Sequence, residues 1–176
     1  MTAEPTRLSS VHFIDLDDAP AVNERLYQAF ERENRVEDVR RTHSFHGRFE
    51  NTYIKRERIP ELAPVTQLAH ACACRILGME RLHLGFWFNE MMPGQRTSLH
   101  AHQELDELLS AVYYIRCADD CGDLVLHDDP ARVTVSPRPG LMVLFPPDLP
   151  HEVEENRSGQ TRLSVAFNFG PWRSPT

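Results

Sequence analysis

The sequence predicts an α+β protein that is mostly β, in which two helices precede an antiparallel β-barrel or jelly roll. Two segments with helical apolar spacing lie within the first 80 residues, and short β-rich runs fill residues 83–170. Gly, Pro and Asp separate these runs at near-regular spacing. Helices followed by many short strands favour a barrel with the helices packed on one outer face.

The first half of the chain supplies both expected helices. Residues 17–34 are expected to form the first helix, with Pro20 near its first turn. Its apolar stripe of Val22, Leu26, Ala29 and Phe30 should face the core. A second helix is expected from Pro60 to Leu77, where Gly78 ends it. Residues 11–16 are typical of a strand, whereas residues 40–53 show no clean period and fit strand or loop.

The second half supplies the barrel. The expected strands cover residues 83–89, 108–117, 123–127, 132–135, 141–145 and 162–169. We therefore expect one domain over residues 1–176, in which residues 1–80 give helical support and a substrate-side segment, and residues 83–170 form the barrel core.

The composition excludes several classes of partner. The chain has 176 residues, 41% of them hydrophobic, and a net charge of −7, which argues against a nucleic-acid or an acidic-membrane partner. No apolar run approaches the roughly 20 residues of a membrane span, and the N-terminus does not resemble a signal peptide, so we expect a cytoplasmic protein. The spacings of the four cysteines do not match a zinc knuckle, and reduced thiols are expected. Nothing in the sequence indicates an oligomeric state.

Three histidines in the barrel segment are candidate metal ligands. His100 and His102 are two residues apart, so on a strand they face the same side, about 7 Å apart along the chain. His151 follows in a Pro-His-Glu-Val turn, after enough short strands for the sheet to return it to the same mouth. Neutral imidazoles bind first-row metals well. A second ligand set stays open, in which an acid, Glu104, Asp106 or Glu107, joins or replaces one histidine.

The last strand indicates what could bind beside the metal. If Arg162 faces inward, alternation places Ser164, Ala166 and Asn168 on the same side. A buried guanidinium is costly without an anion, so Arg162 suggests a bound carboxylate, with a protein acid as the alternative partner. One of the adjacent tyrosines Tyr113 and Tyr114 must also point into the barrel.

Other polar and aromatic residues are candidates for contacting an organic substrate at the open end of the barrel. Substrate-binding groups converge at the mouth of such barrels. The set comprises Trp87, Asn89, His43, Arg48 and Tyr53, with His46 as a further candidate.

A series of motifs along the second half of the chain is specific in its combined order: Trp87-Phe-Asn89, His100-Ala-His102, Ser110-Ala-Val-Tyr-Tyr114, Gly122-Asp-Leu-Val-Leu-His-Asp-Asp-Pro130, Gly140-Leu-Met-Val-Leu-Phe-Pro146, Pro150-His-Glu-Val153 and Arg162-Leu-Ser164. This half of the chain resembles the Fe(II)/2-oxoglutarate-dependent oxygenases. Within them it is similar to the prolyl-hydroxylase-like branch and to small bacterial oxygenases with His-x-His.

The resemblance implies a double-stranded β-helix, a cupin-like jelly roll, that binds Fe(II) and the cosubstrate 2-oxoglutarate. It implies iron at His100, His102 and His151, and a distal carboxylate of 2-oxoglutarate held by Arg162 with help from Tyr114 and Ser164. No catalytic residue beyond the metal ligands is implied. The reaction would hydroxylate or desaturate a small molecule or peptide. The family's commonest motif has Asp or Glu where this chain has His102.

A second resemblance is to the cupins, through Gly94-x5-His100-x-His102-x4-Glu107 and Gly140-x5-Pro146 followed by His151. It implies a metal dioxygenase or isomerase that uses no keto acid. Against it, Tyr114 stands where the motif has Gly, and the motif gives Arg162 no role. A non-enzymatic metal-dependent ligand-binding barrel is the third alternative. Fold-level analogy leaves the organic substrate open.

Overall fold

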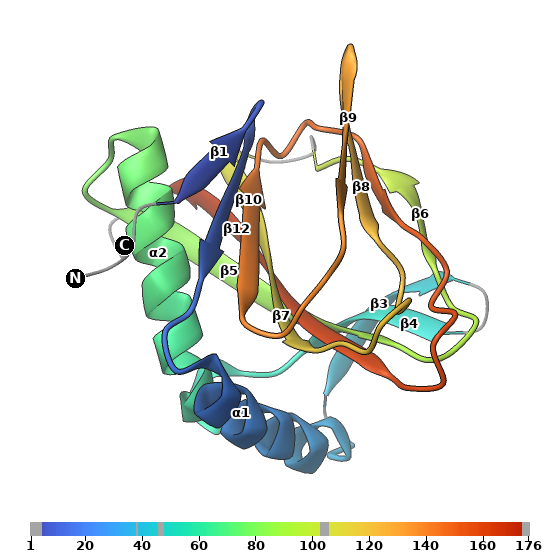
Figure 1. Ribbon diagram of the computed structural model, residues 1–176. Helices are drawn as coiled ribbons and strands as arrows, with labels where there is room; N and C mark the ends of the chain where they lie inside the picture. Colours follow the sequence, from blue (N-terminus) through green and yellow to red (C-terminus); the bar gives the residue numbers. More distant parts are fainter. Residues whose placement is uncertain (1–4, 38, 46–47, 103–105, 174–176) are drawn as a thin grey trace.

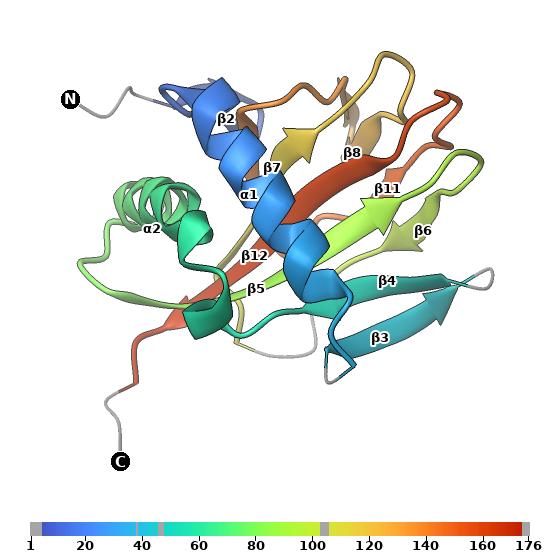
Figure 2. The ribbon, with the colours of Figure 1, turned by 90° about the horizontal axis from the view of Figure 1, so that it is seen from below.

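A computed structural model describes residues 5–37, 39–45, 48–102 and 106–173. Two antiparallel sheets face each other, and both helices lie on one side of the larger sheet (Figures 1 and 2). Within the described ranges, neither helix is long and apolar enough to cross a membrane.

The larger sheet has eight strands among the described residues. Their order is β1 (Thr6–Leu8), β2 (Val11–Asp15), β10 (Leu141–Phe145), β7 (Leu109–Arg116), β12 (Arg162–Pro171), β5 (Leu82–Met91), β4 (Arg48–Tyr53) and β3 (Arg40–Phe45). The smaller sheet has the order β6 (Thr97–His100), β11 (His151–Val153), β8 (Leu124–Asp128) and β9 (Ala131–Val135). This arrangement confirms the mostly β, jelly-roll fold class.

The two helices begin and end where the local sequence favours it. Helix α1 (Ala19–Asn34) and helix α2 (Ala63–Leu77) each carry proline in the first turn, where the missing N–H costs nothing. Gly78 ends α2 in the left-handed conformation, with φ of 65°. Short 3₁₀ turns cover Arg56–Arg58 and Pro60–Leu62, so α2 starts three residues later than the sequence predicts.

Strand alternation divides the interior into two hydrophobic cores. On β12, Leu163, Val165, Phe167 and Phe169 face the helices and pack against α1 and α2. Residues of β2, β7, β8, β9 and β10 form the second core between the two sheets. Tyr113 points toward α1, where its hydroxyl donates to Asn23 Oδ1 at 2.6 Å, while Tyr114 packs between the sheets. Tyr114 is thus the tyrosine that points into the barrel.

The strand boundaries differ from the sequence expectation at two places near the barrel mouth. The strand β6 ends at His100, so His102 lies beyond it rather than on it. His151 opens the short strand β11 instead of lying in a turn. Residues 40–53, for which strand and loop were both open, form the hairpin β3–β4 at the edge of the larger sheet. Short strands give a weak period-2 signal, which explains both differences.

Candidate metal centre and cosubstrate pocket

The three candidate histidines come together at one point between β6 and β11. One ring nitrogen from each of His100, His102 and His151 lies within 4.8 Å of the others. His100 and His151 are direct cross-strand partners, with ring centroids 4.3 Å apart. His102 reaches the same point from the segment after β6, with ring centroids 5.1 Å from His100 and 5.3 Å from His151. The cluster suits a single metal ion.

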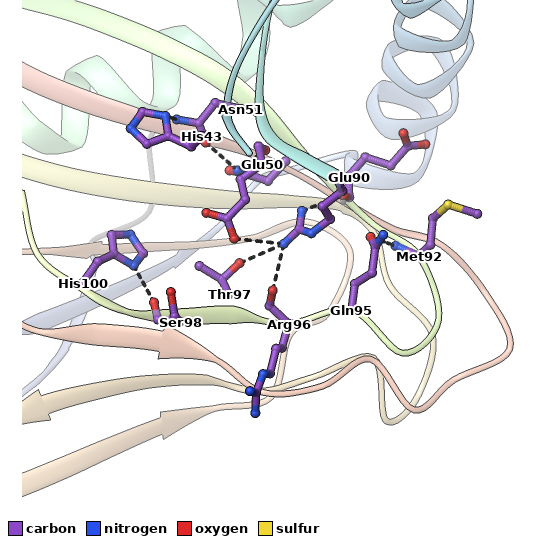
Figure 3. Close-up of polar contacts among 12 residues, drawn as sticks. His43, Glu50, Asn51, Glu90, Met92, Gln95, Arg96, Thr97, Ser98 and His100 are labelled. Atoms are coloured by element: carbon purple, nitrogen blue, oxygen red, sulfur yellow. Dashed lines mark hydrogen bonds and ion pairs between the residues drawn. The ribbon is translucent and has the colours of Figure 1, made fainter. Parts of the chain in front are cut away.

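Backbone carbonyls orient two of these imidazoles. Nδ1 of His100 donates to the carbonyl of Ser98 at 2.8 Å (Figure 3), and Nδ1 of His151 donates to the carbonyl of Leu149 at 2.8 Å. A carbonyl oxygen only accepts, so the proton is on Nδ1 and the lone pair is on Nε2. Fixing the tautomer and ring orientation in this way is how proteins prepare histidine for a metal.

Burial keeps the two less exposed histidines neutral. Burial, and then the charge of nearby His100, lowers the pKa of His102 to about 4. The same two causes lower the pKa of His151 to about 3. Near pH 7 both rings therefore keep the free electron pair that a metal ion needs.

A second group of polar atoms lies deeper between the sheets, around Arg162. The Arg162 residue is only 3% exposed, and its Nη1 donates to the carbonyl of Gly122 at 2.7 Å. Its guanidinium carbon lies 5.1 Å from the centroid of the Tyr114 ring. The Arg162 Nε and the Tyr114 hydroxyl are both buried without a hydrogen-bond partner. Ser164 is buried too and is the cross-strand partner of Tyr114.

These atoms form a pocket that suits an anion. In the described part of the chain, Arg162 makes no ion pair with an acid, so its charge is buried without a counter-charge. Burial raises the pKa of Tyr114, and its hydroxyl therefore stays protonated and able to donate. A carboxylate accepts from a guanidinium and a phenol together, which would satisfy both unpaired groups.

Gly122 is a contributor that the sequence did not single out. Its φ of 93° is in the left-handed region, and a Cβ there would lie 2.2 Å from the backbone oxygen of Glu154. Only glycine fits this position, and its carbonyl then holds Arg162. The sequence shows a turn at Cys121-Gly122, but nothing in it indicates which carbonyl meets the arginine.

Trp87 and Asn89 lie on the face of β5 that points into the barrel. Their cross-strand partners on β12 are Ala166 and Ser164, respectively. The Trp87 ring meets His102 edge-on at a centroid distance of 6.0 Å, and Tyr53 lies 6.3 Å from Trp87. The structure thus brings Trp87 and Tyr53 next to the histidine cluster.

His43 joins the same neighbourhood from the hairpin β3–β4 (Figure 3). Its Nδ1 lies 2.8 Å from Thr42 Oγ1 and 3.1 Å from Asn51 Nδ2, and its φ of 57° is unusual for a non-glycine residue. Asn51 Oδ1 also accepts from Asn89 Nδ2 at 3.2 Å, which links the hairpin to β5. His46 lies outside the described residues.

The acidic residues weighed as alternative metal ligands do not join the cluster in the described residues. Glu107 is near enough for its charge to raise the pKa of His102, and its Oε2 is buried without a partner, but it is not among the clustered ligands. Asp106 is exposed and pairs with Arg173. Glu104 lies outside the described residues.

Comparison with known proteins agrees with this site. The family model of the 2OG-Fe(II) oxygenase superfamily matches residues 69–170, more than half of the chain. No curated protein sequence matches it.

Solved structures share the fold at low sequence identity. A Pseudomonas putida prolyl-4-hydroxylase has a TM-score of 0.69 and 20% identity. The match covers 93% of this chain and 94% of that prolyl-4-hydroxylase. A Trichoplax adhaerens prolyl hydroxylase in complex with a hypoxia inducible factor peptide fragment has a TM-score of 0.74 and 13% identity. The match covers 92% of this chain and 84% of that prolyl hydroxylase. The epimerase SnoN in complex with Fe³⁺, alpha ketoglutarate and nogalamycin RO has a TM-score of 0.72 and 16% identity. The match covers 92% of this chain and 79% of SnoN.

The family match confirms the resemblance to the Fe(II)/2-oxoglutarate-dependent oxygenases, and the two prolyl hydroxylases share the fold. Fe(II) and 2-oxoglutarate are accordingly the cofactor and cosubstrate. The chain belongs to the 2OG-Fe(II) oxygenase superfamily.

Proposed function

We propose that this 2-oxoglutarate-dependent oxygenase binds Fe(II) through His100, His102 and His151, and binds 2-oxoglutarate through Arg162, Tyr114 and Ser164. The observation that carries the proposal is the buried Arg162, whose Nε and neighbouring Tyr114 hydroxyl have no partner in the protein. A buried cation with unused donors is stabilised when an anion enters, and 2-oxoglutarate carries a carboxylate at the end that does not chelate iron.

Two separate groups of residues would bind the metal and the cosubstrate. The three histidines hold the metal and leave positions open for other ligands. Arg162, Tyr114 and Ser164 would fix the distal carboxylate and so orient the keto acid toward the metal. With O₂ as the oxidant, iron and 2-oxoglutarate would supply the oxidising chemistry: one oxygen atom would enter succinate as the keto acid loses CO₂, and the other would hydroxylate a C–H bond of the substrate or leave as water in a desaturation.

The organic substrate would lie on the open side of the cluster. We propose that Trp87, Tyr53, Asn89 and His43 contact it and that the reaction is a hydroxylation or desaturation. A small molecule or a peptide would suit such a site, since the solved structures with this fold include complexes with nogalamycin RO and with a peptide fragment. Screening metabolites and peptides for succinate release would identify it.

We also propose a cytoplasmic location. Cys74, Cys117 and Cys121 are not in disulfides, which suits a reducing compartment.

Anaerobic titration of 2-oxoglutarate into the Fe(II) protein tests the proposed function. A keto acid that chelates Fe(II) produces a metal-to-ligand charge-transfer band, so we expect a saturable visible absorption. Glutarate is the control, because it has both carboxylates but no keto oxygen and should produce no band. Fe(II) binding without any band on adding 2-oxoglutarate would favour the cupin-type or the ligand-binding alternative.

A further inference from the structure

The strand that carries His100 is weakly held by its own sheet. β6 is four residues long and lies at the edge of the smaller sheet, with β11 as its neighbour. The ladder between them has two residue pairs, His151 with His100 and Val153 with Thr97, with an irregularity between the pairs. Backbone bonds also hold the chain on either side of β6, from Asn156 N–H to the Gln95 carbonyl at 2.8 Å and from His102 N–H to the Pro147 carbonyl at 2.7 Å. With so short a ladder between them, side-chain contacts can add to what holds this edge strand in place.

The hairpin strand β4 also has little backbone pairing with its neighbour β5. In the described residues the two strands pair at Thr52 and Phe88. Beyond that pair, side chains replace the backbone ladder. Asn89 Nδ2 donates to the carbonyl of Glu50 at 2.7 Å, and Arg48 Nη1 donates to the carbonyl of Glu90 at 3.0 Å.

Arg48 extends this bridge to β6. Its Nη2 lies 3.0 Å from the carbonyl of Arg96, 3.1 Å from Thr97 Oγ1 and 3.2 Å from Glu50 Oε1. In Figure 3 these bonds converge from Glu50, Arg96 and Thr97 onto one guanidinium group. The Arg48 side chain is 9% exposed. One arginine thus joins β4, β5 and the start of β6, which belong to two different sheets.

We propose that Arg48 is a positioning residue that ties the edge strand β6 to β4 and β5 and thereby holds His100 in the metal cluster. Arg48 then acts through the protein rather than on the substrate, because its guanidinium donors already serve four acceptors in the chain. The inference rests on the proposed metal site. His100 lies three residues after Thr97 on the same strand, so a shift of the strand start would move its ring.

Fe(II) affinity, measured anaerobically by competition with a chromophoric chelator, tests this role. Arg48→Met removes the bridge and should weaken Fe(II) binding by about tenfold to a hundredfold, the range for groups that orient metal ligands. Arg48→Lys should weaken it less than Arg48→Met, because the ammonium group can still donate on one side of the bridge, although not on both. Thr97→Val removes one acceptor on β6 and leaves Arg48 in place, so we expect a smaller loss.

A matched control separates this effect from the loss of any arginine in the hairpin. Arg41 is also partly buried, and its Nη2 donates to the carbonyl and side-chain oxygens of Asn34 at 2.5 and 2.8 Å; among the described residues it makes no hydrogen bond to β6. Arg41→Met should leave Fe(II) affinity unchanged. The double variant Arg48→Met with Glu50→Gln removes the carboxylate that the single variant leaves unpaired, and its affinity should stay low.

A second readout follows the geometry of the site. The absorption spectrum of the Co(II)-substituted protein should change in Arg48→Met, because His100 moves, and should match the parent in Arg41→Met. Parent-like Fe(II) affinity in the Arg48 variants, or full recovery in the double variant, would overturn the inference alone. A parent protein that binds no divalent ion would overturn the proposed metal site and the inference with it.

Discussion

At the scale of single residues, Arg162 decides which chemistry the barrel can support. Three histidines on a barrel are compatible with several metal enzymes, but a buried guanidinium that meets no acid requires an anionic ligand. Its immediate neighbours confirm that the space is polar, since the Tyr114 hydroxyl there is also unpaired. In the proposed function the metal and the cosubstrate are bound by separate residues, so each site can be perturbed on its own.

The first prediction separates the two affinities. Arg162→Ala should weaken 2-oxoglutarate binding to the Fe(II) protein by about 1.5 to 3.5 orders of magnitude, because losing one partner of a buried charged pair costs about 2–5 kcal/mol. Fe(II) affinity should be nearly unchanged, since Arg162 is not in the histidine cluster. Isothermal titration under anaerobic conditions measures both. A variant that binds 2-oxoglutarate as tightly as the parent would refute the role of Arg162.

The second prediction concerns the choice between His102 and Glu107 as metal ligand. His102→Ala should lower Fe(II) affinity strongly, because a three-ligand site loses a third of its protein ligands. Glu107→Gln keeps the shape of the side chain and should bind Fe(II) like the parent, since its carboxylate lies outside the cluster. The reverse pattern in a chelator competition assay would favour the cupin-type ligand set.

At the scale of elements, the sequence predicts long and regular segments well. The stripe of α1 and the alternation along β12 correctly separate residues that face the helices from residues that face the barrel, including Arg162. Both segments repeat their pattern over several turns or pairs, so a single exception does not hide it. The inward face of β12 was therefore readable from the sequence.

The short elements could not be predicted in the same way. Four residues of β6 do not show where a strand ends, so the position of His102 beyond it was missed. The hairpin β3–β4 is joined to β5 and β6 by side-chain bonds, such as those of Arg48, which no local pattern encodes. The carbonyls that orient His100 and His151 lie two residues before them, and the carbonyl that binds Arg162 lies 40 residues before it; none of these contacts has a residue-type signature.

The third prediction tests how α1 is fixed to the larger sheet. Tyr113→Phe removes the hydroxyl that donates to Asn23 Oδ1 at 2.6 Å and leaves that buried oxygen unpaired. The free energy of unfolding should fall by about 1–3 kcal/mol, measured by urea denaturation. Tyr27→Phe on α1 is the control, because in the described residues the Tyr27 hydroxyl makes no hydrogen bond, and this variant should change stability little. Equal losses in both variants would contradict the assignment.

At the scale of the whole molecule, the two ligands are expected to bind to different sheets. His100 and His151 lie on β6 and β11 of the smaller sheet, and His102 directly follows β6. Tyr114, Arg162 and Ser164 lie on β7 and β12 of the larger sheet. A keto acid that chelates the metal and reaches Arg162 would therefore join the two layers across the inter-sheet core.

The last prediction follows from this division. Metal alone should stabilise the protein by linkage, and 2-oxoglutarate added with metal should stabilise it further, by about 2.7 kcal/mol at a hundred times its Kd. For a protein of this size, that corresponds to a rise in Tm of about 5–10 °C. Without metal, 2-oxoglutarate loses its chelating contact and should add much less. Arg162→Ala should keep the increment due to metal and lose most of the increment due to 2-oxoglutarate, as measured by anaerobic differential scanning fluorimetry. If 2-oxoglutarate raises Tm equally with and without metal, the cosubstrate does not bridge the two sheets.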